Sequence, residues 1–378
     1  MTFDLRPLTF DLRPLTIMFL QTLSATNYKN LKQIEVQFCK GVNCFIGNNG
    51  MGKTNLLDAI YYLAFCKSRT CHADTQVIKH DEPYLMLDAC FCVSDKQERI
   101  SVGLQRGQKK VVKRNKKEYE RLADHIGLIP LVIVSPNDLE LIIEGSSERR
   151  KLIDGIISQY DKQYLHELLA YNKALLQRNT LLRAHVSDAE LLEVCESIMA
   201  QKAAYIYPKR VEFLEQYIPI FAQYYREIAG DNEQVSIRYE SHLQQGDLLT
   251  SLQQSRYKDE VVGYTTVGIH KDELAFYLGD YPLKRIASQG QTKSFLVAMK
   301  LAQFEFMKKA CGKYPILLLD DIFDKLDATR VERIVKLVST ERFGQIFITD
   351  TNREHLDTLL QQVEGEKMLF TIYQGGIK

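Results

Sequence analysis

A glycine-rich segment near residue 50 limits the possible folds of this chain more than any other feature. Its sequence is Gly47, Asn48, Asn49, Gly50, Met51, Gly52, Lys53, Thr54, which fits the pattern G-x-x-x-x-G-K-[ST]. The apolar run before it, 42–46, is typical of a strand, and the run after it, 55–63, has the period of an amphipathic helix. A strand, a glycine-rich loop and a helix in this order predict an α/β fold. A chance match on a glycine-rich turn would not explain the flanking strand and helix.

The same segment has the chemistry of a phosphate-binding loop. Glycines let the backbone curl so that several N–H groups point at one phosphate, and the N-terminus of the following helix adds a positive partial charge. We expect Lys53 to reach the β- and γ-phosphates of ATP, and Thr54 to give its hydroxyl to Mg²⁺. The sequence therefore predicts ATP and Mg²⁺ as cofactors, held by residues 47–54 and by the adjoining Asn55.

A second motif supplies two acids. The apolar run 316–319 is typical of a buried parallel strand, and it ends in Asp320 and Asp321. Taken alone, these could be two exposed acids after a core strand. Beside a phosphate-binding loop, a Walker B pattern is the better interpretation: Asp320 would hold Mg²⁺, and Asp321 would orient and polarise the attacking water. With Lys53, these aspartates are the candidate catalytic residues.

A third motif, Ser-Gln-Gly-Gln-Thr-Lys at 288–293, precedes a strongly predicted helix at 295–307. A serine and a glycine at a helix N-terminus suit an anion, although the serine alone could be only an N-cap. The position of this segment shortly before the acidic strand favours a nucleotide contact. Ser288, Gly290 and Gln291 are therefore candidate nucleotide-binding residues.

Composition excludes several classes of protein. The chain has 378 residues, 45% of them hydrophobic and 26% charged, which is typical of a globular protein. Lys and Arg total 49 against 48 Asp and Glu, so nucleic-acid binding would need a local basic patch. We see no apolar run long enough for a membrane span and no secretory leader, and we expect a cytoplasmic protein without a membrane partner. Eight cysteines without a C-x-x-C pair predict reduced thiols and no zinc site.

The first residues contain a tandem repeat, because Thr-Phe-Asp-Leu-Arg-Pro-Leu occurs at 2–8 and again at 9–15. Such a repeat is neither a coiled coil nor a solenoid. We expect residues 1–17 to form a disordered N-terminal extension outside the fold. The alternative is a short ordered arm.

Hydrophobic periodicity divides the rest of the chain into two kinds of region. Strands are predicted within 19–46 and at 84–93, 99–105, 131–134, 235–239, 274–278 and 346–349. Helices are predicted at 164–182, 189–228, 290–310 and 328–339. The fold class is therefore α/β, with a head formed by 18–137 plus 263–378 and an inserted, mainly α-helical arm formed by 138–262.

The three motifs in this order resemble those of ABC-type ATPases, and further segments are similar to the RecF family of bacterial DNA replication and repair ATPases, which are SMC-like. These segments are Thr-Asn-Tyr-Lys-Asn-Leu at 26–31, Lys-Ser-Arg-Thr at 67–70, Ser-Pro-Asn-Asp-Leu at 135–139, Glu-Arg-Arg-Lys-Leu-Ile-Asp at 148–154, Gln-Arg-Asn at 177–179 and Gly-Ile-His-Lys-Asp-Glu-Leu at 268–274. The resemblance extends from about residue 18 to the C-terminus and implies an ABC-type ATPase head with a helical arm.

The resemblance also implies a mode of action. RecF-like proteins form an ATP-dependent homodimer that binds double-stranded DNA near single-strand gaps at the nucleoid. With RecO and RecR they promote loading of RecA, and weak, DNA-stimulated ATP hydrolysis resets them. In that scheme Ser288 and Gly290 contact the γ-phosphate of ATP held by Lys53 of the other subunit.

The chain departs from these patterns at several positions. Asp321 is one methylene shorter than the glutamate of transporters, a difference that RecF-like proteins share. In the loop after the two acids, Asp327 matches the RecF family and is a further candidate nucleotide-binding residue. Thr349 stands where transporters have a histidine, and Gln76 is only a positional candidate for their conserved glutamine.

Basic residues gather in one predicted hairpin, and they are the candidate DNA contacts: Lys109, Lys110, Lys113, Arg114, Lys116 and Lys117. Contacts with phosphates would give salt-dependent binding without sequence preference. The alternative is an ordinary solvated hairpin tip. For a second basic group, 149–151, we favour ion pairs with Glu144, Glu148 and Asp154 over DNA contact.

We therefore predict an ATP-dependent, DNA-binding recombination and repair factor. The alternative is an ABC-type ATPase that acts as a nucleotide-sensing adaptor without contacting DNA, and only the basic hairpin argues against it. A transporter subunit is disfavoured by the long separation of Lys53 from Ser288 and by the helical insertion. A chromosome-structural ATPase with long arms is disfavoured because no heptad pattern is sustained.

Overall fold

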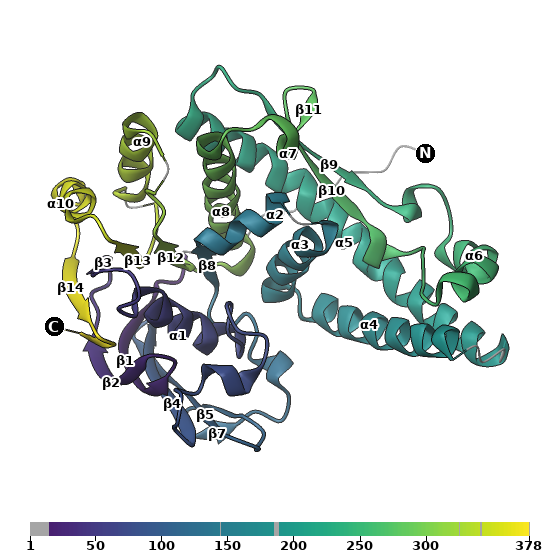
Figure 1. Cartoon of the computed structure of the whole chain (residues 1–378), viewed down its shortest axis with the longest axis horizontal. Coiled ribbons are helices and arrows are strands. Elements are labelled where there is room, and N and C mark those ends of the chain that lie inside the picture. The colour runs from purple at the N-terminus through teal and green to yellow at the C-terminus, as the bar shows by residue number, and fades with distance from the viewer. Residues whose placement is uncertain (1–14, 144, 185–188, 325, 341, 378) are drawn as a thin grey trace.

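A mainly parallel six-stranded sheet forms the centre of the head in the computed structural model of the chain (Figure 1). The structure describes residues 15–143, 145–184, 189–324, 326–340 and 342–377. In spatial order the strands of this sheet are β15 (Gly376–Ile377), β14 (Lys367–Tyr373), β3 (Val42–Ile46), β13 (Ile346–Asp350), β12 (Ile316–Asp320) and β8 (Leu131–Val134). Only β15 runs antiparallel to its neighbour. Both ends of the chain therefore contribute to one sheet, as the sequence predicts.

A second, antiparallel sheet lies below the first in Figure 1. Its strands in spatial order are β2 (Leu31–Gln37), β1 (Met18–Tyr28), β4 (Tyr84–Val93), β5 (Lys96–Gln105), β6 (Val111–Arg114) and β7 (Lys117–Glu118). Alternate residues of β4 and β5 are buried, which is typical of a sheet with one face in the core. Helix α1 (Lys53–Phe65) packs between the two sheets and shares one hydrophobic core with them.

Helices cover the other face of the parallel sheet, so that β3, β12 and β13 are buried on both sides. The covering helices are α8 (Gln289–Cys311), α9 (Ala328–Val338) and α10 (Arg353–Gln362). A second hydrophobic core runs from this face through α8 into the arm. The predicted helices at 290–310 and 328–339 are thus confirmed.

The arm consists of helices, of which α4 and α6 lie at the right in Figure 1. They are α2 (Glu140–Ile143), α3 (Ser146–Tyr160), α4 (Lys162–Arg183), α5 (Ala189–Ala229) and α6 (Leu248–Val262). The 41-residue helix α5 packs against α4 and α6 and also reaches α8 and α9 of the head. Helix α5 therefore contacts helices of both lobes and connects the arm to the head.

A small sheet crosses the boundary that the sequence predicts between arm and head. Its strands are β9 (Val235–Glu240), β10 (Glu273–Leu278) and β11 (Tyr281–Pro282). The short connecting helices are η1 (Asp74–Val77), η2 (Leu122–Asp124), η3 (Pro136–Leu139), η4 (His242–Gln244), η5 (Ile269–Lys271) and α7 (Leu283–Ile286). Since β9 and β10 lie on opposite sides of residue 262, the two lobes share this sheet.

The N-terminal residues divide into two groups. Residues 1–14, which hold nearly all of the tandem repeat, lie outside the described residues. Thr16 donates its backbone N–H to Gly312 at 2.9 Å, and the backbone oxygen of Ile17 accepts from the N–H of Ser94 at 3.2 Å. Backbone pairing with the head therefore begins before Met18, where we expected the fold to start.

No helix within the described part of the chain is both long enough and apolar enough to span a bilayer.

Two buried arginines hold the arm together. Arg178 of α4 is fully buried and pairs with Glu196 of α5 at 2.9 Å and with Asp259 of α6 at 2.7 Å. Arg210 of α5 pairs in the same way with Asp154 and Asp272. Three of the family-like segments, 148–154, 177–179 and 268–274, thus supply partners in these networks. Their role in the structure is to join helices.

Replacing Arg178 with alanine should destabilise the protein by about 3–5 kcal/mol, because two buried carboxylates would lose their common cation. Calorimetry should show a melting temperature several degrees lower. Arg353→Ala is the matched control, because the pair of Arg353 with Asp357 is exposed and such pairs contribute little. An unchanged melting temperature of Arg178→Ala would contradict the structural role of the network.

Candidate functional site

The glycine-rich loop curls around the side chain of Lys53. Gly50 and Gly52 have φ values of 79° and 115°, in the region that favours glycine. The Lys53 ammonium is buried and donates hydrogen bonds to the backbone oxygens of Gly47 at 2.7 Å and Asn48 at 3.3 Å. The loop joins β3 to the N-terminus of α1. This geometry fits the phosphates of ATP, because a buried cation and a helix N-terminus lie in one curled backbone.

Two asparagines support the loop from outside. The Asn30 side chain donates to the backbone oxygen of Gly50 at 3.1 Å and accepts from Asn55 Nδ2 at 2.7 Å. A Cβ added at Gly52 would lie 3.0 Å from Asn30 Oδ1, so this packing also requires a glycine. The family-like segment 26–31 therefore positions the loop. The side chain of Asn55, a candidate nucleotide ligand, is engaged with Asn30.

The structure brings the two candidate Mg²⁺ ligands into contact. Thr54 Oγ1 donates to Asp320 Oδ1 at 3.1 Å, and Thr349 Oγ1 donates to the same oxygen at 2.6 Å. The sheet register causes this proximity, because Thr349 of β13 lies opposite Asp320 of β12. Burial raises the pKa of Asp320, while the hydrogen bonds from Thr349 and Thr54 oppose that rise. A hydroxyl and a carboxylate side by side suit Mg²⁺.

Asp321 has a strained backbone and an unpaired oxygen. Its φ is 47°, a conformation that is uncommon outside glycine. Its N–H donates to Thr349 Oγ1 at 3.2 Å, so one threonine holds both acids. Asp321 Oδ1 is buried without a hydrogen-bond partner among the described residues, and burial and the charge of Asp320 raise its pKa. A carboxylate oxygen in this state can accept a hydrogen bond from water.

A cavity of ≈ 180 Å³ adjoins these groups. It is lined by Thr54, Asp58, Arg69, Thr70, Ile133, Ser135, Pro136, Asn137 and Asp320. Asn137 is therefore the polar amide beside the candidate metal ligands, and the sequence analysis missed it. The available signal was its position after the buried strand 131–134, whose carboxyl end lies at the same sheet edge. Gln76 is exposed in η1 and does not line the cavity.

The third motif lies at the N-terminus of α8 and does not meet the loop of its own chain. Ser288 is exposed and caps the helix, since its Oγ accepts from Gln291 N at 3.2 Å. Gln291 Nε2 donates to Glu233 at 3.2 Å. Among the described residues, neither Ser288 nor Gln291 hydrogen-bonds to residues 47–55. Gly290 lies in the first turn of the same helix.

Asp327 caps the helix that follows the acids. Its Oδ1 accepts from the N–H of Arg330 at 2.9 Å, and its Oδ2 lies 3.2 Å from Arg330 Nε. The side chain remains 58% exposed, so it can also face a second molecule.

The six basic hairpin residues fall into two groups. Lys110 points inward to Asp74 at 2.8 Å, and Arg114 forms a two-pronged pair with Glu98. The other four, Lys109, Lys113, Lys116 and Lys117, are exposed. Two of the candidate DNA contacts therefore already have acidic partners.

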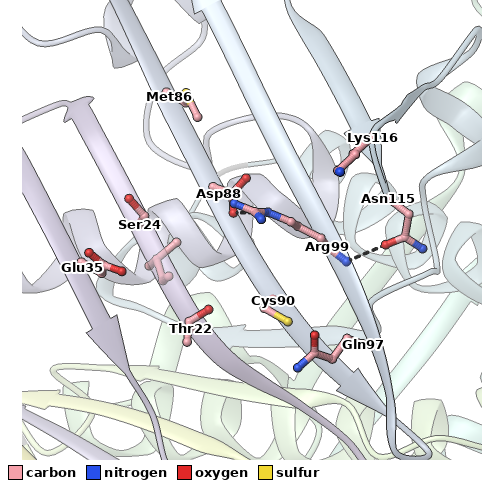
Figure 2. Close-up of a pocket in the computed structure, with 11 residues that line it drawn as sticks. Thr22, Ser24, Glu35, Met86, Asp88, Cys90, Gln97, Arg99, Asn115 and Lys116 are labelled. Carbon is pink, nitrogen blue, oxygen red and sulfur yellow. Dashed lines mark hydrogen bonds and ion pairs between the residues drawn. The ribbon is translucent and has the colours of Figure 1, made fainter.

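A larger hollow of ≈ 550 Å³ lies beside this hairpin on the outer face of the antiparallel sheet (Figure 2). Its floor carries the ion pair of Arg99 with Asp88 at 2.7 Å, and Asn115 and Lys116 lie at its rim. None of the residues of the three motifs lines it. The hollow is therefore separate from the candidate nucleotide site.

In the second basic group, Arg149 and Lys151 form ion pairs with acidic residues. Lys151 pairs with Glu148 at 2.6 Å, as predicted. Arg149 pairs with Glu273 at 2.7 Å, and Arg150 donates to the backbone oxygen of Asp272 at 2.6 Å. Asp154 pairs with Arg210, and Glu144 lies outside the described residues. Because β10, distant in sequence, packs against α3, these two arginines also contact a segment that the sequence analysis did not consider.

Comparison with known proteins identifies close relatives. The family described as RecF/RecN/SMC N terminal domain matches residues 19–368. The chain is 54% identical over 362 residues to the DNA replication and repair protein RecF of Bacteroides fragilis, with 95% of this chain and 98% of that protein covered. It is 53% identical over 363 residues to the protein of the same name from Phocaeicola vulgatus, with 95% and 98% covered.

Solved structures agree with this relationship. The recombination mediator protein RecF with ATP, in the RecFOR pathway, has a TM-score of 0.84 and 32% identity, with 96% of this chain and 99% of that chain covered. An Smc head domain from Pyrococcus furiosus has a TM-score of 0.57 at 18% identity, with 96% and 95% covered, and shows the shared fold alone. These similarities confirm the predicted fold class, an ABC-type P-loop ATPase head with a helical arm.

Replacing Thr349 with valine should reduce ATP turnover by about 10- to 100-fold, because a hydrogen bond to a buried carboxylate is removed. ATP binding should persist, since the loop around Lys53 is untouched. Steady-state turnover and the affinity for a fluorescent ATP analogue would separate the two effects. The exposed Thr351→Val is the matched control. Wild-type turnover of Thr349→Val would show that this hydroxyl does not organise the acids.

Proposed function

Because the chain belongs to the RecF family of DNA replication and repair proteins, we propose that it is an ATP-dependent, DNA-binding recombination and repair factor. Its ATP-induced homodimer binds double-stranded DNA near single-strand gaps and, with RecO and RecR, promotes the loading of RecA. Slow ATP hydrolysis, stimulated by DNA, resets the protein. The observation that carries the nucleotide part of this proposal is the contact between Thr54 and Asp320, beside the loop that encloses Lys53.

We assign the nucleotide contacts as follows. Residues 47–55 surround the phosphates with backbone N–H groups, and Lys53 neutralises the β- and γ-phosphates. Thr54 and Asp320 hold Mg²⁺, and Asn137 lies beside them at the cavity wall. Bound ATP and Mg²⁺ supply the phosphoryl group and the neutralisation of its charge.

Asp321 orients the attacking water and accepts its proton. The buried Oδ1, which has no hydrogen-bond partner among the described residues, supports this role, as does the hydrogen bond that fixes the backbone of Asp321 to Thr349. The short side chain of Asp321 leaves little freedom to adjust, which is consistent with slow turnover.

The third motif completes the site of a second subunit. Ser288 and Gln291 bond to each other at the start of α8, and Gln291 also bonds to Glu233, away from residues 47–55 of the same chain. A helix N-terminus on the surface, with a serine and a glycine, is suited to the γ-phosphate of an ATP held by another copy. Asp327, which caps α9 but stays exposed, lies in the loop that would face the same interface.

Double-stranded DNA is proposed to contact the exposed lysines of the hairpin. Lys109, Lys113, Lys116 and Lys117 all have exposed side chains and lie near one edge of the antiparallel sheet. Such contacts position the protein on the phosphate backbone without reading the sequence.

Replacing Ser288 with arginine should leave ATP binding intact but prevent ATP-dependent dimerisation, because a bulky cation would fill the place of the phosphate contact. Light scattering with and without ATP and Mg²⁺ would measure the molecular mass. Lys53→Ala is the comparison variant that should lose ATP binding and dimerisation together. A normal ATP-dependent dimer of Ser288→Arg would contradict the proposed contact between subunits.

Replacing the four exposed hairpin lysines with serine should weaken DNA binding and flatten its salt dependence. The slope of log K against log salt should fall by up to about 0.9 for each phosphate that the protein no longer neutralises. Fluorescence anisotropy with duplex DNA at several salt concentrations would measure both. The control replaces four exposed lysines elsewhere: Lys32, Lys173, Lys258 and Lys336. An unchanged slope would place the DNA site elsewhere, and no DNA binding by the wild type would favour the adaptor function.

A further inference from the structure

Glu233 lies where the third motif, the loop after the acids and the end of the arm meet. Its Oε1 accepts hydrogen bonds from Gln291 Nε2 at 3.2 Å and from Arg330 Nη2 at 2.9 Å. Its Oε2 accepts from the hydroxyl of Tyr225, near the end of α5. The Glu233 side chain is only 19% exposed, so these partners largely enclose it.

Arg330 extends this connection to the loop after the acids. Its Nη1 donates to Ser294 Oγ of α8 at 3.0 Å, and its Nε lies 3.2 Å from Asp327 Oδ2. One guanidinium thus joins Glu233, the first turns of α8 and the cap of α9. A planar group with several donors is suited to holding three partners in a fixed arrangement.

The same helix also holds the other end of that loop. Lys293 Nζ donates to the backbone oxygen of Asp321 at 2.9 Å and to that of Asp324 at 2.8 Å. The described residues on both sides of residue 325 are therefore connected to the start of α8, by Lys293 on one side and through Arg330 on the other.

The arm is attached at the same point. Arg333 Nη1 donates to the backbone oxygen of Ile228, at the C-terminal end of α5, at 3.1 Å. Arg342 lies 3.5 Å from Glu227 of the same helix. Cationic side chains at a helix C-terminus are also favoured by the helix dipole. The end of α5 is thus fixed to the helices that carry Ser288 and Asp327.

We propose that Glu233 is a positioning residue, which holds the segment 288–291 and the cap of α9 at Asp327 in the arrangement that a second subunit recognises, and links this arrangement to α5. Glu233 acts through Gln291 and Arg330 and touches no nucleotide itself. The inference rests on the proposed ATP-dependent dimer. It adds a residue outside the three motifs that controls how tightly the dimer forms.

The test measures dimerisation of the full-length protein with ATPγS and Mg²⁺ by sedimentation over a range of protein concentrations. Glu233→Ala should raise the dimer dissociation constant by about tenfold or more, because three hydrogen bonds to a charged group are removed, among them those from Gln291 and Arg330. Glu233→Gln should have a smaller effect, since its amide oxygen can still accept from Arg330 or Gln291. The affinity of both variants for ATPγS, measured below the dimerisation range, should stay within about twofold of the wild type.

Asp357→Ala is the matched control, because it removes a carboxylate from an exposed pair with Arg353 and should leave the dimer constant unchanged. Wild-type dimerisation of Glu233→Ala would overturn the inference. A loss of ATPγS affinity as large as the loss of dimer affinity would also overturn it, because it would indicate a general structural role. The same holds if Glu233→Gln dimerises as weakly as Glu233→Ala. A wild-type protein that stays monomeric with ATPγS would overturn the proposed dimer and this inference together.

Discussion

The parallel pairing of β3, β13 and β12 is the constraint on which the candidate site depends. Thr349 lies opposite both Phe45 and Asp320, so the carboxyl ends of the three strands emerge at one edge of the sheet. The glycine-rich loop and the two acids begin at that edge. A shift of one residue in this register would turn Thr349 toward the opposite face of the sheet and remove its hydrogen bond to Asp320. Because the strands are buried on both faces, apolar packing on either side opposes such a shift.

Sequence reasoning succeeded where the signal is local. The strand 131–134, the strand 84–93 and the helix that begins after Ser288 follow directly from residue patterns, and the structure confirms them. Sequence reasoning did not find contacts between residues that are distant in sequence. Glu273, one partner of Arg149, lies in β10, and Asn137 reaches the cavity because β8 lies beside β12. From the sequence, Thr349 is only the residue that stands where transporters have a histidine. The role of its hydroxyl depends on the pairing of β13 with β12, which no local pattern shows. The helix at 248–262 was also missed, because its apolar period is weak.

The buried ion pairs of Arg178 and Arg210 connect the helices of the arm to one another. Desolvating Arg178 and its acids costs free energy that ion pairing only offsets, so such a network contributes specificity of arrangement more than stability. Arg178 joins α4, α5 and α6 near one end of the arm, while Arg210 joins α5 to the segments around Asp154 and Asp272. These pairs fix the helices along the length of α5. A displacement at the tip of the arm would therefore be transmitted along α5 as a whole and not absorbed between its neighbours.

The C-terminal end of α5 determines which residues such a displacement would reach. It meets Glu233, Arg330 and Arg333, and through them the segment that carries Ser288. ATP stabilises a dimer only to the extent that it binds the dimer more tightly than the monomer. In the proposed dimer, a ligand that altered the position of α5 would change the same equilibrium, because the surface offered to the second subunit would move with that helix. Binding at the arm and binding of ATP would then be coupled in both directions: DNA or a partner that favoured the dimer arrangement would raise the affinity for ATP by the factor by which ATP raised the affinity for it.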